Sequence, residues 1–150
     1  MNGRWAVLAG SVLVIVMTLG MASGGAADPK CSERTLDGFY VFTASGFQII
    51  NTALVPVAII EQIRFNGDGT AQATGGRVSF GGTILDTLSA ATYTIGSLTP
   101  PNRGCEGTLI FLGPPVVNLY MFIPPDAQTI QLIRTDAGSV FQGAATKVSK

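Results

Sequence analysis

The segment "VAIIEQIRFNGDGTAQATGGRVSF", which covers residues 57–80, decides the fold of this chain. Apolar and polar residues alternate in its two arms, 57–65 and 70–80, and a period of two is that of a strand with one buried face. The glycines of the intervening "NGDG" supply positive φ, while its Asn and Asp tolerate it. A calcium loop requires a further carboxylate soon after, and none follows Asp68 before Asp86. The segment therefore predicts a β-hairpin.

Alternation with a period of two continues along the chain, and no stretch has the sustained apolar stripe of an amphipathic helix. The runs are separated by "TPPNRG", "GPP", "PPDA" and "TDAG", in which Pro-Pro pairs cannot donate ladder hydrogen bonds. About eight short strands with tight connections predict an all-β fold, a small up-and-down antiparallel β-barrel, in preference to a two-sheet sandwich. Besides the two arms above, strands are expected at 36–44, 91–97, 105–112, 116–123, 128–135 and 139–147.

One long connection, residues 45–56, does not follow this scheme. Its sequence "SGFQIINTALVP" is too apolar for a free loop, and Pro56 makes it a poor interior strand. We expect it to lie over one mouth of the barrel or to add to a sheet edge.

The N-terminal residues have the order of an export signal. Arg4 precedes an apolar run up to Met21, and small residues follow before the polar "DPK". This order predicts a signal peptide at 1–27, cleaved after Ala27 or Ala26, and a single barrel domain at 28–150. The alternative is an uncleaved anchor, because the run is only slightly short of a membrane span. The mature protein is expected to be periplasmic or secreted.

Charge and composition exclude several classes of function. Loss of Arg4 with the signal peptide leaves eight basic and nine acidic residues, a net charge of −1 without a Lys/Arg cluster, so we expect no nucleic-acid partner. The chain has no histidine, which excludes the usual nucleophilic triads and makes a metal site or a cofactor unexpected. The sequence carries no catalytic motif and argues against an enzyme.

Cys31 and Cys105 are the two cysteines of the chain. In an oxidising compartment an isolated pair is most simply a disulfide. Closing a loop of this length stabilises a fold by about 4 kcal/mol on the chain-entropy model.

The motifs "C…L-x-G-x-Y-x-F", "F-x-G-x-G", "T-Y-T…C-x-G-T" and "I-Q-x-I-x-T-D-x-G-[ST]-V" follow one another over nearly the whole mature chain. In this order they resemble a family of small exported bacterial proteins, usually described as uncharacterised. The resemblance implies a secreted β-rich fold and supplies no activity. The chain is also similar to calycin-type barrels at the level of architecture, which does not fix function. The residues that carry the family pattern are Cys31, Leu36, Gly38, Tyr40, Phe42, Phe65, Gly67, Gly69, Thr92, Tyr93, Thr94, Cys105, Gly107, Thr108, Ile130, Gln131, Ile133, Thr135, Asp136, Gly138 and Val140.

Glu61 shares the apolar face of its strand, where a carboxylate is costly unless it is paired. On two other strands, Arg134 and Tyr40 lie on the same face as the apolar residues that are expected to point inward. The three polar groups could therefore form a cluster in an apolar pocket. The alternative is a bulge near Ile60 that turns Glu61 to solvent, with Arg134 at a strand end in water. The candidate pocket consists of Tyr40, Phe42, Ile59, Glu61, Ile63, Leu132 and Arg134.

The run "VVNLYMFI" at 116–123 is apolar on both faces, so both faces are expected to be covered. Tyr120 and Phe122 lie on the outer face and form a candidate interaction surface. Self-association and cover by the chain itself remain equal alternatives.

Three functions are compatible with these features. The first is an exported barrel that binds a small apolar or amphipathic ligand. The second is a structural or surface-interaction protein with a filled core and an exposed patch around Tyr120 and Phe122. The third is a barrel isomerase or cyclase in which Glu61 or Tyr40 acts as acid or base.

Overall fold

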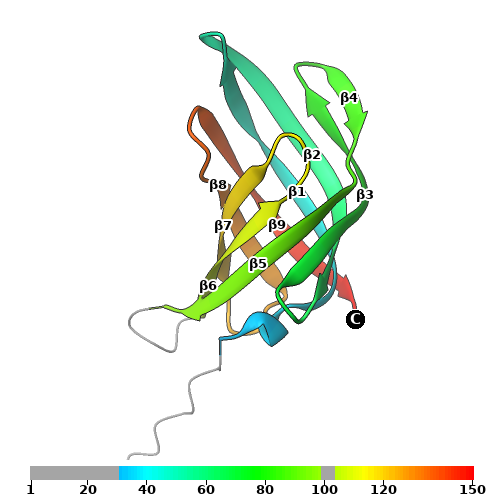
Figure 1. Ribbon diagram of the computed structural model, residues 1–150, viewed down its shortest axis with the longest axis vertical. Coiled ribbons are helices and arrows are strands. Elements are labelled where there is room, and N and C mark those ends of the chain that lie inside the picture. Colours follow the sequence, from blue (N-terminus) through cyan, green and yellow to red (C-terminus); the bar gives the residue numbers. More distant parts are fainter. Residues whose placement is uncertain (1–30, 99–103) are drawn as a thin grey trace, which may run out of the picture.

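The computed structural model describes residues 31–98 and 104–150, and Figure 1 shows a tall β-barrel with one short helix at its lower end. The expected signal peptide at 1–27 lies outside the described residues, as does most of the turn "TPPNRG". A single 3₁₀ turn, η1 (Glu33–Thr35), precedes the first strand. The strands are β1 (Asp37–Ile50), β2 (Ala53–Asn66), β3 (Thr70–Phe80), β4 (Thr83–Asp86), β5 (Ser89–Ser97), β6 (Cys105–Phe111), β7 (Val117–Ile123), β8 (Thr129–Arg134) and β9 (Ser139–Ser149).

The expected up-and-down antiparallel barrel is confirmed. With the exception of β4 and β5, strands that are neighbours in sequence pair in the sheet. β5 pairs with β3 and β9 pairs with β1, which closes an eight-stranded barrel. β4 is an additional strand. β5 pairs with the first part of β3 and β4 with its last part, so β4 and β5 follow one another along the same side of β3. The two strands are separated by Thr87 and Leu88.

The expectation for residues 45–56 was wrong. They extend β1 and β2 into one long hairpin with its turn at Asn51 and Thr52, which rises above the rest of the barrel in Figure 1. Pro56 is tolerated within β2 because the ladder between β2 and β3 begins only at Val57. The missing N–H of Pro56 therefore faces a side where no strand requires it.

The lower half of the barrel is filled by large side chains. The ring of Phe65 lies edge-on to those of Tyr40 and Tyr93, with centroids 5.2 and 5.1 Å away. Such edge-to-face pairs stabilise a core beyond the area that they bury. The largest fully buried side chains are Tyr40, Phe42, Phe65, Leu36, Ile63, Leu109, Leu119, Met121, Ile123 and Ile130.

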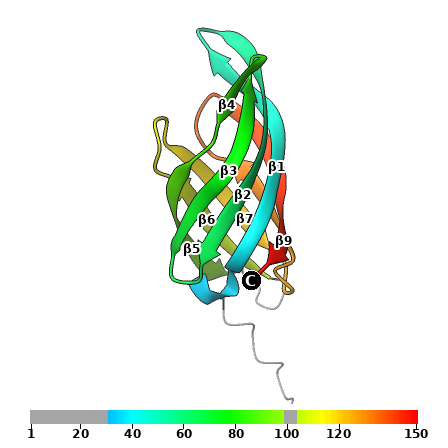
Figure 2. The same ribbon diagram turned by 90° about the vertical axis from the view of Figure 1, so that its right-hand side faces the viewer.

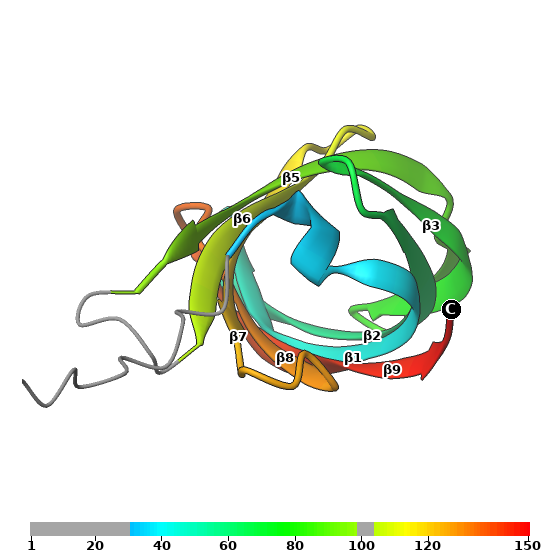
Figure 3. The same cartoon turned by 90° about the horizontal axis from the view of Figure 1, so that it is seen from below.

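Helix η1 lies across the lower mouth of the barrel, as the view from below shows (Figure 3). The Tyr93 hydroxyl lies 2.9 Å from the Glu33 carbonyl oxygen and 3.0 Å from that of Leu36, and it donates to this pair of acceptors. The expected disulfide between Cys31 and Cys105 joins the chain just before η1 to the first residue of β6, with Cα atoms 5.6 Å apart. The disulfide thus anchors η1 over the mouth.

Tyr40 provides a test of the packed lower end. Its buried hydroxyl donates to the Ala127 carbonyl oxygen at 3.0 Å, and burial raises the pKa of Tyr40 to about 12. Tyr40→Phe leaves this carbonyl without its donor, and we expect it to lower the free energy of unfolding by about 1–2 kcal/mol in urea denaturation. Tyr120→Phe removes a hydroxyl that meets Glu106 nearer the surface, and it should cost clearly less. Equal losses in the two variants would contradict this account of the lower end.

Candidate functional site

Most of the candidate pocket residues lie inside the filled core. The side chains of Tyr40, Phe42, Ile63 and Leu132 are at most 4% exposed. Phe42 also contacts Phe141 edge-on, with ring centroids 6.3 Å apart. These residues are therefore placed inward, as the sequence indicates, but they contact one another and their neighbours.

Glu61 is directed into the barrel and is 4% exposed. It lies opposite Phe42 on β1 and Gly76 on β3, and a Cβ at Gly76 would collide with the Glu61 side chain. The alternative, a bulge near Ile60 that turns Glu61 to solvent, is wrong, because neither ladder of β2 shifts register at Ile60. The register instead shifts on β3, where Thr74 is the extra residue, so the alternation of β2 is undisturbed and Glu61 stays inside.

Burial raises the pKa of Glu61 to about 7, since the charged carboxylate is poorly solvated there. The Thr87 side chain opposes this shift, although its buried hydroxyl completes no hydrogen bond. None of the ion pairs within the described residues involves Glu61. Among the described residues, Glu61 is thus a buried carboxyl that gains or loses its proton near neutral pH.

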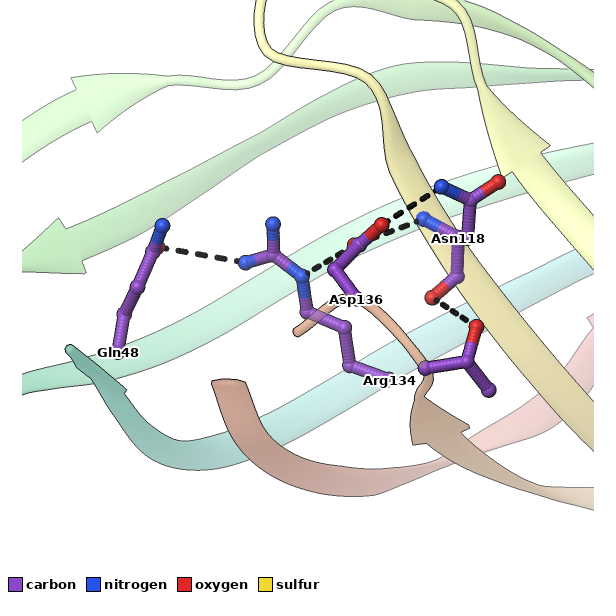
Figure 4. Close-up of polar contacts among 5 residues, drawn as sticks. Gln48, Asn118, Arg134 and Asp136 are labelled. Atoms are coloured by element: carbon purple, nitrogen blue, oxygen red, sulfur yellow. Dashed lines mark hydrogen bonds and ion pairs between the residues drawn. The ribbon is translucent and has the colours of Figure 1, made fainter. Parts of the chain in front are cut away.

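Arg134 belongs to a separate polar network, which Figure 4 shows. The network lies toward the end of β1 that carries Gln48. The Nε of Arg134 donates to Asp136 Oδ2 at 2.7 Å, and its Nη1 donates to Gln48 Oε1 at 3.4 Å. Asn118 Nδ2 donates to the other carboxylate oxygen of Asp136 at 2.6 Å. Partial burial raises the pKa of Asp136, but the hydrogen bonds from Asn118 and Arg134 outweigh it and hold the pKa below its usual value. The network fastens β1, β7 and the β8–β9 turn together.

The structure does not bring Glu61, Arg134 and Tyr40 together. Tyr40 donates to Ala127 at the lower end, whereas Arg134 reaches Gln48, eight residues further along β1 from Tyr40. Eight residues of strand correspond to roughly 26 Å. The alternation of side chains along each strand predicts correctly which face a residue lies on. It does not predict how far along the barrel axis the residue lies.

A hollow of about 660 Å³ lies at the wall formed by β1, β9, β8 and β7, and both outward and inward residues of this wall line it. Two cross-strand rows of outward residues line it, and they run side by side across the four strands. The hollow also reaches Ala44, Ile59, Leu132 and Gly143. The first row is Thr43, Ala144, Gln131 and Phe122, and the second is Ser45, Gln142, Ile133 and Tyr120.

We call these eight side chains the wall hollow, and they show why the wall is recessed. Ala144 has a small side chain between longer outward neighbours, and Gly143 beside it has no side chain on the inner face of the wall. Gly143 cannot be larger, because a Cβ would collide with the Thr43 carbonyl oxygen and with Ala44. Phe122 and Ile133 remain 37% and 50% exposed, so apolar surface is left uncovered at the edge of the hollow.

The wall hollow contains apolar and hydrogen-bonding groups but no charged side chain. The Tyr120 hydroxyl donates to Glu106 Oε2 at 2.8 Å, which holds the ring in place from outside the lining. The candidate interaction surface of Tyr120 and Phe122 thus forms one side of a larger site. The other members of the site also lie on the outward face of their strands. Only the pairing register between β1, β9, β8 and β7 shows that they form continuous rows.

Within residues 31–98 and 104–150, no group of three or more Cys, Asp or Glu side chains is arranged to hold a metal ion. No helix in this part of the chain is long and apolar enough to cross a membrane.

Comparison of the chain with family models, with curated proteins and with solved structures gave no match. The class of protein is therefore defined by the structure itself: an eight-stranded antiparallel β-barrel with a disulfide-anchored lower end and a recessed outer wall.

Proposed function

We propose that this protein is a binding module that holds a small, uncharged amphipathic molecule in the wall hollow. The observation that carries the proposal is the lining, in which two adjacent uncharged rows combine apolar and amide side chains around the small Ala144. Tyr120, Phe122 and Ile133 offer an apolar surface on one side. Gln131 and Gln142 offer amide donors and acceptors beside it. The volume of about 660 Å³ leaves room for a small molecule, which would stay partly exposed because the hollow is open to solvent.

The chemistry of the lining favours a neutral ligand. A charged group that enters the wall hollow loses hydration and meets no opposite charge there, which is unfavourable. An apolar body with hydroxyl groups gains contact with the rings of Tyr120 and Phe122 and hydrogen bonds from the glutamines. The filled lower core leaves no room for a ligand among its large buried side chains.

Isothermal titration calorimetry with n-octyl glucoside, kept below its micelle concentration, tests the proposal. We expect saturable binding of one molecule. Ala144→Phe should weaken this binding about tenfold or more, because the new ring occupies the space above Ala144. Thr146→Phe is the matched control, since Thr146 is exposed on the same strand and the same face, two residues beyond the hollow. Octanoate, which has an aliphatic chain of similar length and a charged head group, should bind more weakly.

A second pair of variants separates this site from general apolar adsorption. Phe122→Ala should weaken octyl glucoside binding, whereas Ile60→Ala removes an exposed apolar side chain from β2, outside the hollow, and should not. Equal effects of Ala144→Phe and Thr146→Phe, or tighter binding of octanoate, would overturn the proposal. In that event the second candidate, a surface-interaction protein with a filled core, becomes the better explanation.

A further inference from the structure

β4 is the only strand within the described ranges that has a neighbouring strand on one side alone. All four of its residues are exposed, and the side chains of Ile84 and Leu85 are 60% and 51% exposed. Figures 1 and 2 show β4 at the upper end, where it continues the β3 hairpin away from the rest of the wall. β4 lies outside the wall hollow and is independent of it.

The register of the hairpin determines which backbone groups of β4 are free. Backbone groups in an antiparallel pair point alternately toward and away from the partner strand. The N–H of Thr87 donates to the Gly76 carbonyl oxygen at 3.2 Å, so Thr87 points toward β3. By alternation Leu85 and Thr83 do the same, and the backbone groups of Ile84 and Asp86 point to the free edge.

The free edge carries little protection against pairing. Natural edge strands are blocked by lysines, prolines or bulges, and the sequence "TILD" has none of these within it. Its one charged residue, Asp86, forms an ion pair with Arg77 of the same hairpin, which partly offsets its charge. Leu88, two residues beyond the end of β4, is 71% exposed.

We propose that β4 pairs with β4 of a second copy of this chain, antiparallel across a two-fold axis, with Leu85 opposite Leu85. In this register Ile84 lies opposite Asp86 of the second copy, so all the free backbone groups of the two strands meet in hydrogen-bonded pairs. The two Leu85 side chains contact each other across the axis.

Two other registers satisfy the same alternation and are less favourable. With Asp86 opposite Asp86, like charges face each other directly. With Ile84 opposite Ile84, Asp86 lies opposite Gly82, which has a φ of 91° in the hairpin turn and cannot continue a ladder. Charge and turn geometry therefore select the Leu85 register. Because four residues form a short ladder, the dimer is expected to be weak and to depend on concentration.

Sedimentation velocity of the full, oxidised chain over a wide range of concentrations is the first test. The wild type should shift from monomer to dimer as its concentration rises. Ile84→Pro should raise the dissociation constant at least about tenfold, because it removes an N–H from the free edge without removing one from the ladder with β3. Ile84→Thr keeps the N–H and is the control that should still dimerise. A wild type that stays monomeric throughout, or that dimerises equally well as Ile84→Pro, would overturn the proposal.

Cross-linking tests the register without weakening the edge. Leu85→Cys should form an intermolecular disulfide under mild oxidation, because residues opposite each other in a non-hydrogen-bonded pair are about 4.5 Å apart at Cα. Ile84→Cys should cross-link far less, because in this register residue 84 lies opposite Asp86 of the second copy and not opposite residue 84. Peptide mapping verifies that Cys31 and Cys105 remain joined. Faster cross-linking of Ile84→Cys than of Leu85→Cys would contradict the proposed register.

Discussion

At pH 8 the Glu61→Gln variant is expected to unfold at a higher urea concentration than the wild type, whereas at pH 5 the two should unfold nearly together. The reason is the buried carboxyl of Glu61, whose pKa rises from its ordinary value of 4.5 to about 7 in the folded barrel. The folded state therefore holds a proton that the unfolded state has released between these two pH values. Stability that is present at low pH is lost as the pH rises through about 7.

The expected size of this effect is about 2 to 3 kcal/mol between pH 5 and pH 8. The chain has no histidine, so no side chain with an ordinary pKa in this range obscures the effect. The pKa values of Asp68 and Asp136 are lowered in the folded state, so their effect on stability has the opposite sign. Their contribution to stability is lost only in acid, where the two carboxylates become protonated. Glu106→Gln, the same chemical change nearer the surface, should keep the pH profile of the wild type. A wild-type profile that is flat between pH 5 and 8 would contradict the burial of Glu61.

Reduction of the Cys31–Cys105 disulfide is expected to lower the free energy of unfolding by about 4 kcal/mol, since the bond closes a loop with a sequence separation of 74 residues. The physical reason is the larger conformational freedom of the unfolded chain once the loop is open. The loss should also free the residues before β1, including η1 at the lower mouth, because Cys31 directly precedes this segment.

Urea unfolding of the oxidised protein, the reduced protein and the double variant Cys31→Ala/Cys105→Ala measures this effect. The reduced protein and the double variant should have similar midpoints, well below that of the oxidised protein. Reductant should leave the double variant unchanged, which controls for effects of the reductant itself. Equal midpoints for the oxidised and reduced protein would show that the bond contributes no stability.

The period of two in the sequence was sufficient to predict the barrel and most of its strands. The arms 57–65 and 70–80 lie within β2 and β3, and the turn at 66–69 joins them. The hairpin at 45–56 was missed because Pro56 argues against a strand, and only the sheet shows that β2 has no β3 partner at that position. β4 was missed because its four residues form an irregular run beside a Gly-Gly turn.

The candidate site was less predictable than the fold. Parity placed Glu61 and Tyr40 inside the barrel and Phe122 outside it, and the structure agrees. Whether an interior is filled depends on how side chains from all strands meet, and parity along one strand does not contain this information. The wall hollow depends on register between β1, β9, β8 and β7, which single strands do not specify. The family resemblance and the expected export remain predictions.

The location of a bound ligand is the most direct test of the central claim that the outer wall of the barrel is the binding site. Amide chemical shifts of the oxidised protein should be followed by two-dimensional NMR while n-octyl glucoside is added below its micelle concentration. We predict saturable shifts that cluster at Gln131, Ile133, Gln142 and Ala144, with the amides around Glu61 and Thr87 unchanged. Saturable shifts confined to the residues around Glu61 and Thr87, or no saturable shifts at all, would contradict the account.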